Sequence, residues 1–381
     1  MRNLMSRAAA VAAAAGTLLI RPTRVASASG AAQVPAAERK RWAARRASVL
    51  RAILAITASA ALCVTALAAP AGAKVSGPSG QIVYERLIAG QSDFPGGLAS
   101  VITANPDGGQ AQEVPLTYQP EVFSRTVWSP DGNKLLVSHV DRLDSSGNFL
   151  PFRPAIVSPS GAGFTLLEMA YAPFDMDCTA WASNTRLLCG FGGDHPGVFS
   201  VRASDGGDPM RLTTNPFGTS DQGAQDLPLD TSPDGTRFVF MRFKPGPTET
   251  SKHSALFVEG LDGSGLRQIT PYGVTHAHDL PGAQWSPDGH KIISANTAGV
   301  VFTVNPDGSG LRVIHLQTAN SNYFAFEPGW SPDGTKIIFG MSINGSEGIF
   351  TANADGSNVS QITNSPTFDA APDWGTHPLA P

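Results

Sequence analysis

A five-residue phrase, Trp-Ser-Pro-Asp-Gly, recurs along this chain and limits what the chain can fold into. Six copies are recognisable, some of them degenerate, and their first residues are Trp128, Trp181, Thr231, Trp285, Trp330 and Trp374. Successive copies are 53, 50, 54, 45 and 44 residues apart. A period in this range is typical of propellers and solenoids.

The residue types of the phrase predict a tight turn followed by a strand. Proline presets φ at the second turn position, Ser and Asp bond the local backbone, and glycine tolerates left-handed geometry. Short apolar segments rich in β-branched and aromatic residues follow the turns, at residues 134–138, 237–241, 291–294 and 336–339. They are too short for helices, so we expect strands.

Each repeat also contains a second glycine turn, such as Asn305-Pro-Asp-Gly308, which predicts a four-stranded antiparallel sheet. Residues 81–87 resemble a second strand that lacks a first, whereas residues 370–374 resemble a first strand that lacks a second. Pairing the two would complete a sheet and hide its edges. We therefore predict an all-β fold, a six-bladed β-propeller over residues 74–381, with an open solenoid as the alternative.

Several outer strands end in a Leu-Thr or Ile-Thr pair, at residues 212–213, 269–270 and 362–363. With the Trp-Ser-Pro-Asp-Gly turns, these pairs make residues 80–375 resemble the TolB-like β-propeller family. The resemblance implies a scaffold that hosts binding modules, lyases and hydrolase-associated domains alike. The TolB protein also carries an α/β domain before its propeller, whereas here residues 74–79 lead directly into the first predicted strand.

Residues 1–73 differ in composition from the rest and are predicted to be an export signal with an Ala-rich extension. A basic segment, residues 39–46, precedes an apolar run at 49–67, and Ala71-Gly-Ala73 provides small residues for cleavage before Lys74. We expect an exported protein with no stable membrane insertion after cleavage. An uncleaved anchor is the alternative, since the run has the length of a membrane span.

Charge and cysteine usage set further limits on partners and compartment. Removing residues 1–73 takes away ten basic residues and Glu38, which leaves 17 Lys and Arg against 30 Asp and Glu, a net charge of −13. Such a domain repels phosphate backbones, so we expect no nucleic-acid partner. If the turn at Ser183-Asn184 closes a hairpin, Cys178 falls opposite Cys189, which predicts a disulfide in an oxidising compartment; two buried free thiols are the alternative.

One acidic residue lies shortly before each Trp position. These residues are Glu121, Asp177, Asp226, Asp279, Glu327 and Asp369. The connections that carry them open on one face of a propeller, so they are candidates for a ring that binds a basic peptide end or a metal ion at the channel mouth. The other interpretation is that these acids accept backbone hydrogen bonds in adjacent loops.

His276 and His278 are the best candidates for a metal site, because their spacing puts both imidazoles on one face of an extended segment beside Asp279. Oligogalacturonate lyases, which are similar in blade sequence, use histidines and a divalent metal. A metal-dependent polysaccharide lyase is therefore the alternative function. Bound metal that is lost when both histidines are replaced would favour it.

The sequence contains no G-x-S-x-G nucleophile elbow and no Gly-rich phosphate loop before a helix. The preferred prediction is an exported, monomeric, non-catalytic propeller without a required cofactor. It is expected to bind a peptide, a protein or a cell-envelope glycan on its loop face or channel mouth.

Overall fold

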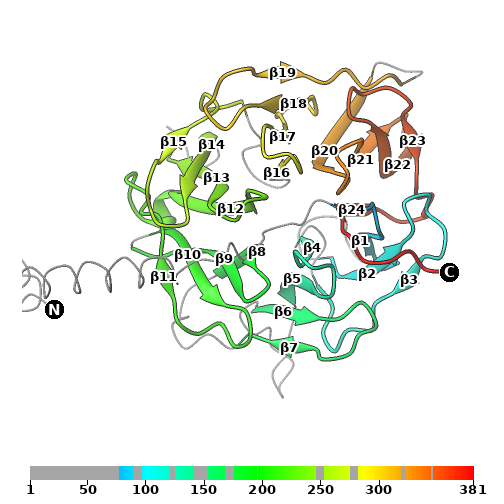
Figure 1. Cartoon of the computed structure of the whole chain (residues 1–381), viewed down its shortest axis with the longest axis horizontal. Coiled ribbons are helices and arrows are strands. Elements are labelled where there is room, and N and C mark those ends of the chain that lie inside the picture. Colours follow the sequence, from blue (N-terminus) through cyan, green and yellow to red (C-terminus); the bar gives the residue numbers. More distant parts are fainter. Residues whose placement is uncertain are drawn as a thin grey trace, which may run out of the picture. The chain divides into compact units, whose positions relative to one another are not determined.

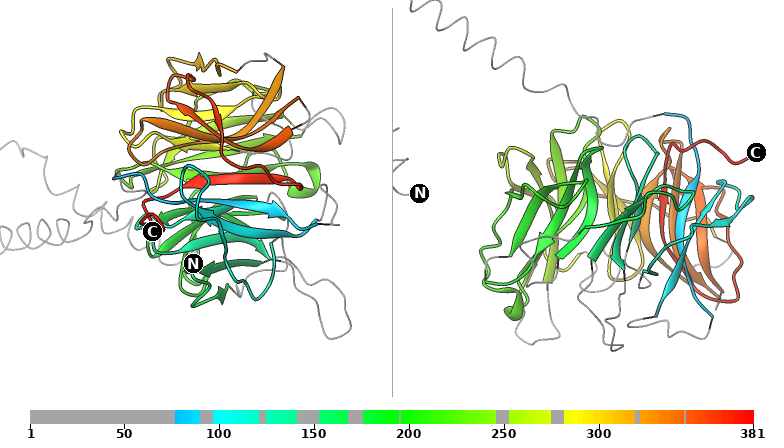
Figure 2. Two further views of the ribbon diagram at one scale, coloured as in Figure 1. Left: turned by 90° about the vertical axis from the view of Figure 1, so that its right-hand side faces the viewer. Right: turned by 90° about the horizontal axis from the view of Figure 1, so that it is seen from below.

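The computed structural model describes residues 77–89, 97–120, 125–140, 153–167, 176–194, 196–245, 253–274, 282–318, 322–344 and 346–381. Within these residues, six four-stranded antiparallel sheets surround a common axis (Figures 1 and 2). The predicted six-bladed β-propeller is confirmed. The same residues contain one 3-10 helix, η1 (Ser220–Gln222), and no α-helix.

The sheets are numbered here as blades 1 to 6, with blade 1 containing β1. Their inner strands, in blade order, are β24 (Asp369–Trp374), β4 (Thr126–Trp128), β8 (Met176–Ser183), β12 (Gln225–Thr231), β16 (Ala283–Trp285) and β20 (Tyr323–Trp330). The second strands are β1 (Ile82–Leu87), β5 (Leu135–Val140), β9 (Arg186–Phe191), β13 (Arg237–Lys244), β17 (Ile292–Ala295) and β21 (Lys336–Ile343). The third strands are β2 (Ala99–Ala104), β6 (Arg153–Val157), β10 (Gly197–Arg202), β14 (His253–Gly260), β18 (Val301–Val304) and β22 (Ser346–Asn353). The outer strands are β3 (Gln112–Glu113), β7 (Thr165–Leu166), β11 (Met210–Arg211), β15 (Arg267–Gln268), β19 (Arg312–Val313) and β23 (Ser360–Gln361).

Side chains of the Ser-Pro-Asp-Gly phrase hold the turn between the first two strands. In blade 5, Gly289 N–H donates to the Ser286 carbonyl oxygen at 2.8 Å. The Ser286 hydroxyl donates to Asp288 at 2.5 Å and accepts from Lys291 N–H at 2.9 Å. Gly289 has a φ of 72°, a left-handed conformation that favours glycine. The same side-chain contacts recur around Ser129, Ser232 and Ser331.

The two ends of the propeller sequence meet in blade 1. β24 pairs antiparallel with β1, so that Trp374 lies opposite Ile82 and Asp373 opposite Val83. In Figure 1 the red β24 lies beside the blue β1. Blade 1 is therefore completed from both ends, as predicted, and the ring closes without a free inner edge.

Hydrophobic clusters fill the six junctions between neighbouring blades. Five of the clusters contain the Trp that begins a repeat, namely Trp128, Trp181, Trp285, Trp330 and Trp374. Between blades 3 and 4 this position is Thr231, and Phe238, Phe240 and Phe257 fill the junction instead. The Thr231 hydroxyl donates to the Trp181 carbonyl oxygen at 2.8 Å. The repeated Trp is thus a packing residue between blades.

Near the axis, the residue before the Trp position ties one blade to the next. Its side chain accepts the backbone N–H of the following blade's Trp in three pairs, Asp230 with Trp285, Gln284 with Trp330 and Asp373 with Trp128, at 2.8, 2.5 and 2.9 Å. Gln284 also donates to Asp373 at 2.9 Å. This last contact joins blades 5 and 1, so a buried polar network crosses the centre of the ring.

Closure of the ring predicts how the chain responds to truncation. Ending it after Thr363 removes β24, so the edge of β1 is exposed and we expect aggregation and a lower melting temperature than that of the full chain. Ending it after Gly375 keeps β24 and serves as the control. Size-exclusion chromatography and thermal unfolding measure both. A chain ending at Thr363 that melts like the full-length protein would contradict the closure scheme.

Candidate functional site

Some of the predicted site residues lie outside the part of the chain that the structure describes. These are Glu121, Asp279, His276 and His278. Asp177 lies in β8, but its side chain is not described. The proposed acidic ring and metal site therefore stay predictions at these positions. Asp226, Glu327 and Asp369 are described, and all three are buried.

Asp226 is held by Arg242 of its own blade and by the segment that leads from blade 3 to blade 4. Its carboxylate accepts two hydrogen bonds from Arg242, at 2.6 and 2.8 Å, and their side chains are 0% and 4% exposed. Thr213 and Asn215 donate to it as well, at 2.6 and 3.0 Å. A carboxylate with these four donors has its hydrogen-bonding capacity largely met inside the protein.

Asp369 occupies the corresponding position in blade 1. It accepts hydrogen bonds from Arg86 at 2.7 and 3.0 Å, in the same register as the pair between Asp226 and Arg242. Arg86 is more exposed, at 33% of its side chain. Both acids thus join the first two strands of a blade. Their described partners are side chains, mainly an Arg on the neighbouring strand, and not the loop backbone groups that the alternative interpretation expected.

Glu327 has a different environment, close to the axis. Its backbone has a φ of 47°, and its Oε2 accepts the Ala371 N–H at 2.8 Å, while Oε1 has no hydrogen-bond partner among the described residues. Burial raises the pKa of Glu327 to about 7, against the opposing effect of the Arg125 charge. Both residues line a narrow cavity together with Gln284. The three described acids therefore do not share one environment.

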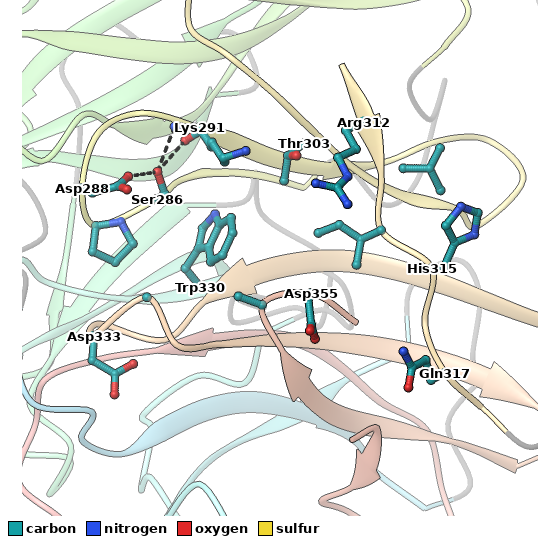
Figure 3. A pocket seen from close by; sticks show the side chains of 15 residues that line it. Ser286, Asp288, Lys291, Thr303, Arg312, His315, Gln317, Trp330, Asp333 and Asp355 are labelled. Atoms are coloured by element: carbon teal, nitrogen blue, oxygen red, sulfur yellow. Dashed lines mark hydrogen bonds between the residues drawn. The ribbon is translucent and has the colours of Figure 1, made fainter. Parts of the chain in front are cut away.

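A pocket of about 510 Å³ lies between blades 5 and 6, at the end of the blades that carries the Ser-Pro-Asp-Gly turns. Its volume falls in the range of small-ligand sites, roughly 300–1,000 Å³. Figure 3 shows Lys291 and Arg312 on one wall and Asp333 and Asp355 on the other, with Trp330 between them. All four charged residues are exposed, whereas Trp330 is 5% exposed.

The two walls differ in net charge, because blade 6 contributes the acids Asp333 and Asp355, whereas blade 5 contributes Lys291 and Arg312 together with the acid Asp288. Burial acts to raise the pKa of Asp333, but hydrogen bonds from Ser331 and Thr335 outweigh it and hold the pKa below its usual value. A hydrogen bond from Ser357 lowers the pKa of Asp355. Both acids are therefore carboxylates at neutral pH, facing the cationic side chains of blade 5. The pocket suits a ligand with charges of both signs or with many hydrogen-bonding groups.

Neighbouring junctions show why this one is open. Between blades 4 and 5, Arg237 lies over Trp285 at 4.9 Å from the ring centroid. Arg267 bridges the same junction by donating to the Asp307 carbonyl oxygen at 3.1 Å. Arg312 is the counterpart of Arg267. Arg312 pairs with Thr303 of β18, and Arg267 pairs with Val258, which holds the equivalent position of β14. Among the described contacts, Arg312 makes no such bridge to blade 6.

Sequence reasoning missed this pocket. It placed the candidate site at the opposite end of the blades, where the acids lie. Trp330 and Asp333 belong to the repeated Trp-Ser-Pro-Asp-Gly phrase, but because the phrase recurs in several repeats it does not indicate which junction contains a pocket. In the part of the chain that the structure describes, it is the packing of blade 5 against blade 6 that leaves a pocket beside this copy.

Other findings concern metals, membranes and cysteines. In the part of the chain that is described, no group of three or more His, Cys, Asp or Glu side chains is placed to hold a metal ion. None of the described residues forms a helix long and apolar enough to cross a membrane. Cys178 lies opposite Cys189 in the strand register, and a disulfide joins them.

Comparisons with known proteins define the fold. No protein-family model matches the chain, and no curated protein matches it. Among solved structures, TolB from Acinetobacter baumannii is similar with a TM-score of 0.53 and 14% identity, over 77% of this chain and 66% of that chain. A chain of a nidogen/laminin complex has a TM-score of 0.51 and 8% identity, over 78% and 100%. An oligogalacturonate lyase in complex with manganese has a TM-score of 0.44 and 15% identity, over 77% and 75%.

At such identities, the likeness to TolB and to the nidogen/laminin chain shows a shared propeller fold alone, and the present chain spans just under two thirds of that TolB chain. The score of the lyase is too low to support the lyase alternative. Function has to be argued from the residues of this chain.

The contrast between the two Asp–Arg pairs is testable. Replacing Asp226→Ala leaves the buried Arg242 charge uncompensated, so we expect a loss of about 3–5 kcal/mol in the free energy of unfolding. Asp369→Ala should cost less, because water can solvate the partly exposed Arg86. Denaturant unfolding of the full chain measures both. Equal losses would contradict the predicted contrast between the two pairs, and no loss for Asp226→Ala would show that Asp226 is not the internal anchor described here.

Proposed function

We propose that this protein is an exported, monomeric binding module that uses its propeller as a rigid frame and takes its ligand in the pocket between blades 5 and 6. The observation that carries the proposal is the pocket itself. Its volume suits a small ligand or a short segment of a larger one, and its charged residues stand on two separate blades. Turns fixed by the Ser and Asp contacts hold both walls in place.

Binding is favoured over catalysis by the state of these groups. The Asp333 and Asp355 carboxylates accept hydrogen bonds from their own turns, and their pKa values are lowered. A general acid or base works best with a pKa close to the ambient pH. These carboxylates are better suited to pairing with a ligand cation or accepting its hydrogen bonds. The lyase alternative depends on His276 and His278, and no described residue adds support to it.

Screening the full chain on peptide and glycan arrays tests the binding proposal. We expect a ligand whose binding is weakened about fivefold by Arg312→Glu, since an exposed charge contact is worth up to ~1 kcal/mol. Arg267→Glu is the matched control, because it changes the same position in blade 4, outside the pocket. Binding that responds equally to both changes, or no ligand sensitive to Arg312→Glu, would contradict the proposal.

Export is supported by the predicted signal and by the disulfide between Cys178 and Cys189, since such bonds persist mainly in oxidising compartments. Mass spectrometry of the chain secreted by a bacterial host should give a mature protein that begins at Lys74. Without reductant, its two cysteines should resist alkylation. Retention of residues 1–73, or two alkylated thiols, would contradict this part of the proposal.

A further inference from the structure

The protein itself shows how a peptide segment lies along a junction between blades. Residues 375–381 follow β24 and run outward between blades 1 and 2. The His377 ring stacks on Trp128, with centroids 5.1 Å apart and planes 12° apart, and its Nδ1 lies 2.8 Å from the Gly132 carbonyl oxygen. Farther out, Ala380 exchanges two hydrogen bonds with the Asn105 side chain, at 2.9 and 3.0 Å. The red tail in Figure 1 follows this outward path.

The pocket between blades 5 and 6 is the counterpart of that junction. Both Ile82 and Ile292 pair with the Trp that ends the inner strand, so β1 and β17 are in equivalent register. By the same register, Thr303 corresponds to Thr103 and Arg312 to Gln112. The turn residues correspond as well. Trp330 takes the place of Trp128, and Gly334 takes the place of Gly132.

Two differences turn the covered junction into an open one. In blade 1 the chain continues after the inner strand β24 as the tail. In blade 5 the chain after the inner strand β16 forms the turn Ser286 to Gly289 and returns as β17, so no described segment continues outward past Trp330. In addition, no described aromatic or cationic side chain stacks on Trp330. By contrast, His377 stacks on Trp128 and Arg237 lies over Trp285. The path that the tail follows between blades 1 and 2 is a pocket between blades 5 and 6.

We propose that this pocket binds an extended peptide of another protein, with acidic side chains toward blade 5 and basic side chains toward blade 6. The inference rests on the proposed function and specifies the class of its ligand. A peptide is favoured because the chain's own tail lies along the equivalent junction, with its backbone groups bonded to Asn105 and Gln81 of blade 1 and its His377 ring stacked on Trp128 of blade 2.

The charges on the walls determine the side-chain pattern. In an extended segment, successive side chains point to opposite sides. Lys291, Arg312 and the acid Asp288 belong to blade 5, whose wall is net positive, whereas Asp333 and Asp355 belong to blade 6, whose wall is negative. A segment in which acidic and basic residues alternate therefore presents its acids to the net positive wall and its bases to the negative wall. A segment with the same residues in two blocks presents both charges to both walls.

Fluorescence anisotropy with the full chain tests this inference. The probe is a labelled, end-blocked hexapeptide of three Glu-Lys repeats, and the comparison peptide has three Glu followed by three Lys. We expect the alternating peptide to bind about fivefold more tightly. Arg312→Glu should weaken its binding about fivefold, and Asp355→Asn should weaken it to a smaller extent. Because Arg312 and Asp355 are exposed, neither change should alter the melting temperature.

Matched controls are available in blade 4. Arg267→Glu changes the counterpart of Arg312. Asp262→Asn changes the counterpart of Asp355, because each of these two carboxylates accepts hydrogen bonds from the backbone N–H and the hydroxyl of a serine in its own turn. Both controls should leave binding unchanged.

The possible results separate this inference from the proposed function. Equal binding of the two peptides, no binding of either, or no effect of Arg312→Glu on peptide binding overturns the peptide inference. If a glycan on the array binds in an Arg312-dependent manner while the peptides do not, the peptide inference is wrong and the binding function stands. If no ligand of any class depends on Arg312, both are wrong.

Discussion

The pairing of β24 with β1 is the constraint on which the rest of this structure depends. Each blade packs on two neighbours, and blades 6 and 2 would each lose one side of their packing if blade 1 were incomplete. The register that places Trp374 opposite Ile82 also sets Asp373 where it accepts the Trp128 N–H and the Gln284 side chain. One strand pair therefore fixes both the closure of the ring and the polar network at its centre.

Within this closed frame, the repeats have diverged at their junctions while keeping their turns. The turn contacts around Ser286 recur in three other blades, because they are local and do not depend on neighbouring blades. What contacts the exposed side of the repeated Trp ring differs from one junction to another. His377 covers Trp128, Arg237 covers Trp285, and a pocket adjoins Trp330. A pocket can thus be present at one junction of a repeat protein while the turns of the repeat stay the same.

The acidic residues illustrate how sequence position alone can mislead. Six acids a few residues before the Trp position suggested one ring. However, Asp226 and Asp369 are five positions before it and face an Arg on the next strand, whereas Glu327 is three positions before it and lies near the axis. A shift of two residues along a bulged inner strand changes which groups a side chain meets. Spacing along the sequence was too coarse to detect this.

The sequence by itself determined the number of blades, the turns, the closure by the two ends of the propeller and the opposition of Cys178 to Cys189. These features follow from local turn chemistry and from the period of two in strands, both of which are written in consecutive residues. Only the tertiary structure decided that Gln284 reaches Asp373, that Asp226 is paired with Arg242, and that the junction beside Trp330 is open. These outcomes depend on contacts between residues far apart in the chain, and on what does or does not fill the space between two blades.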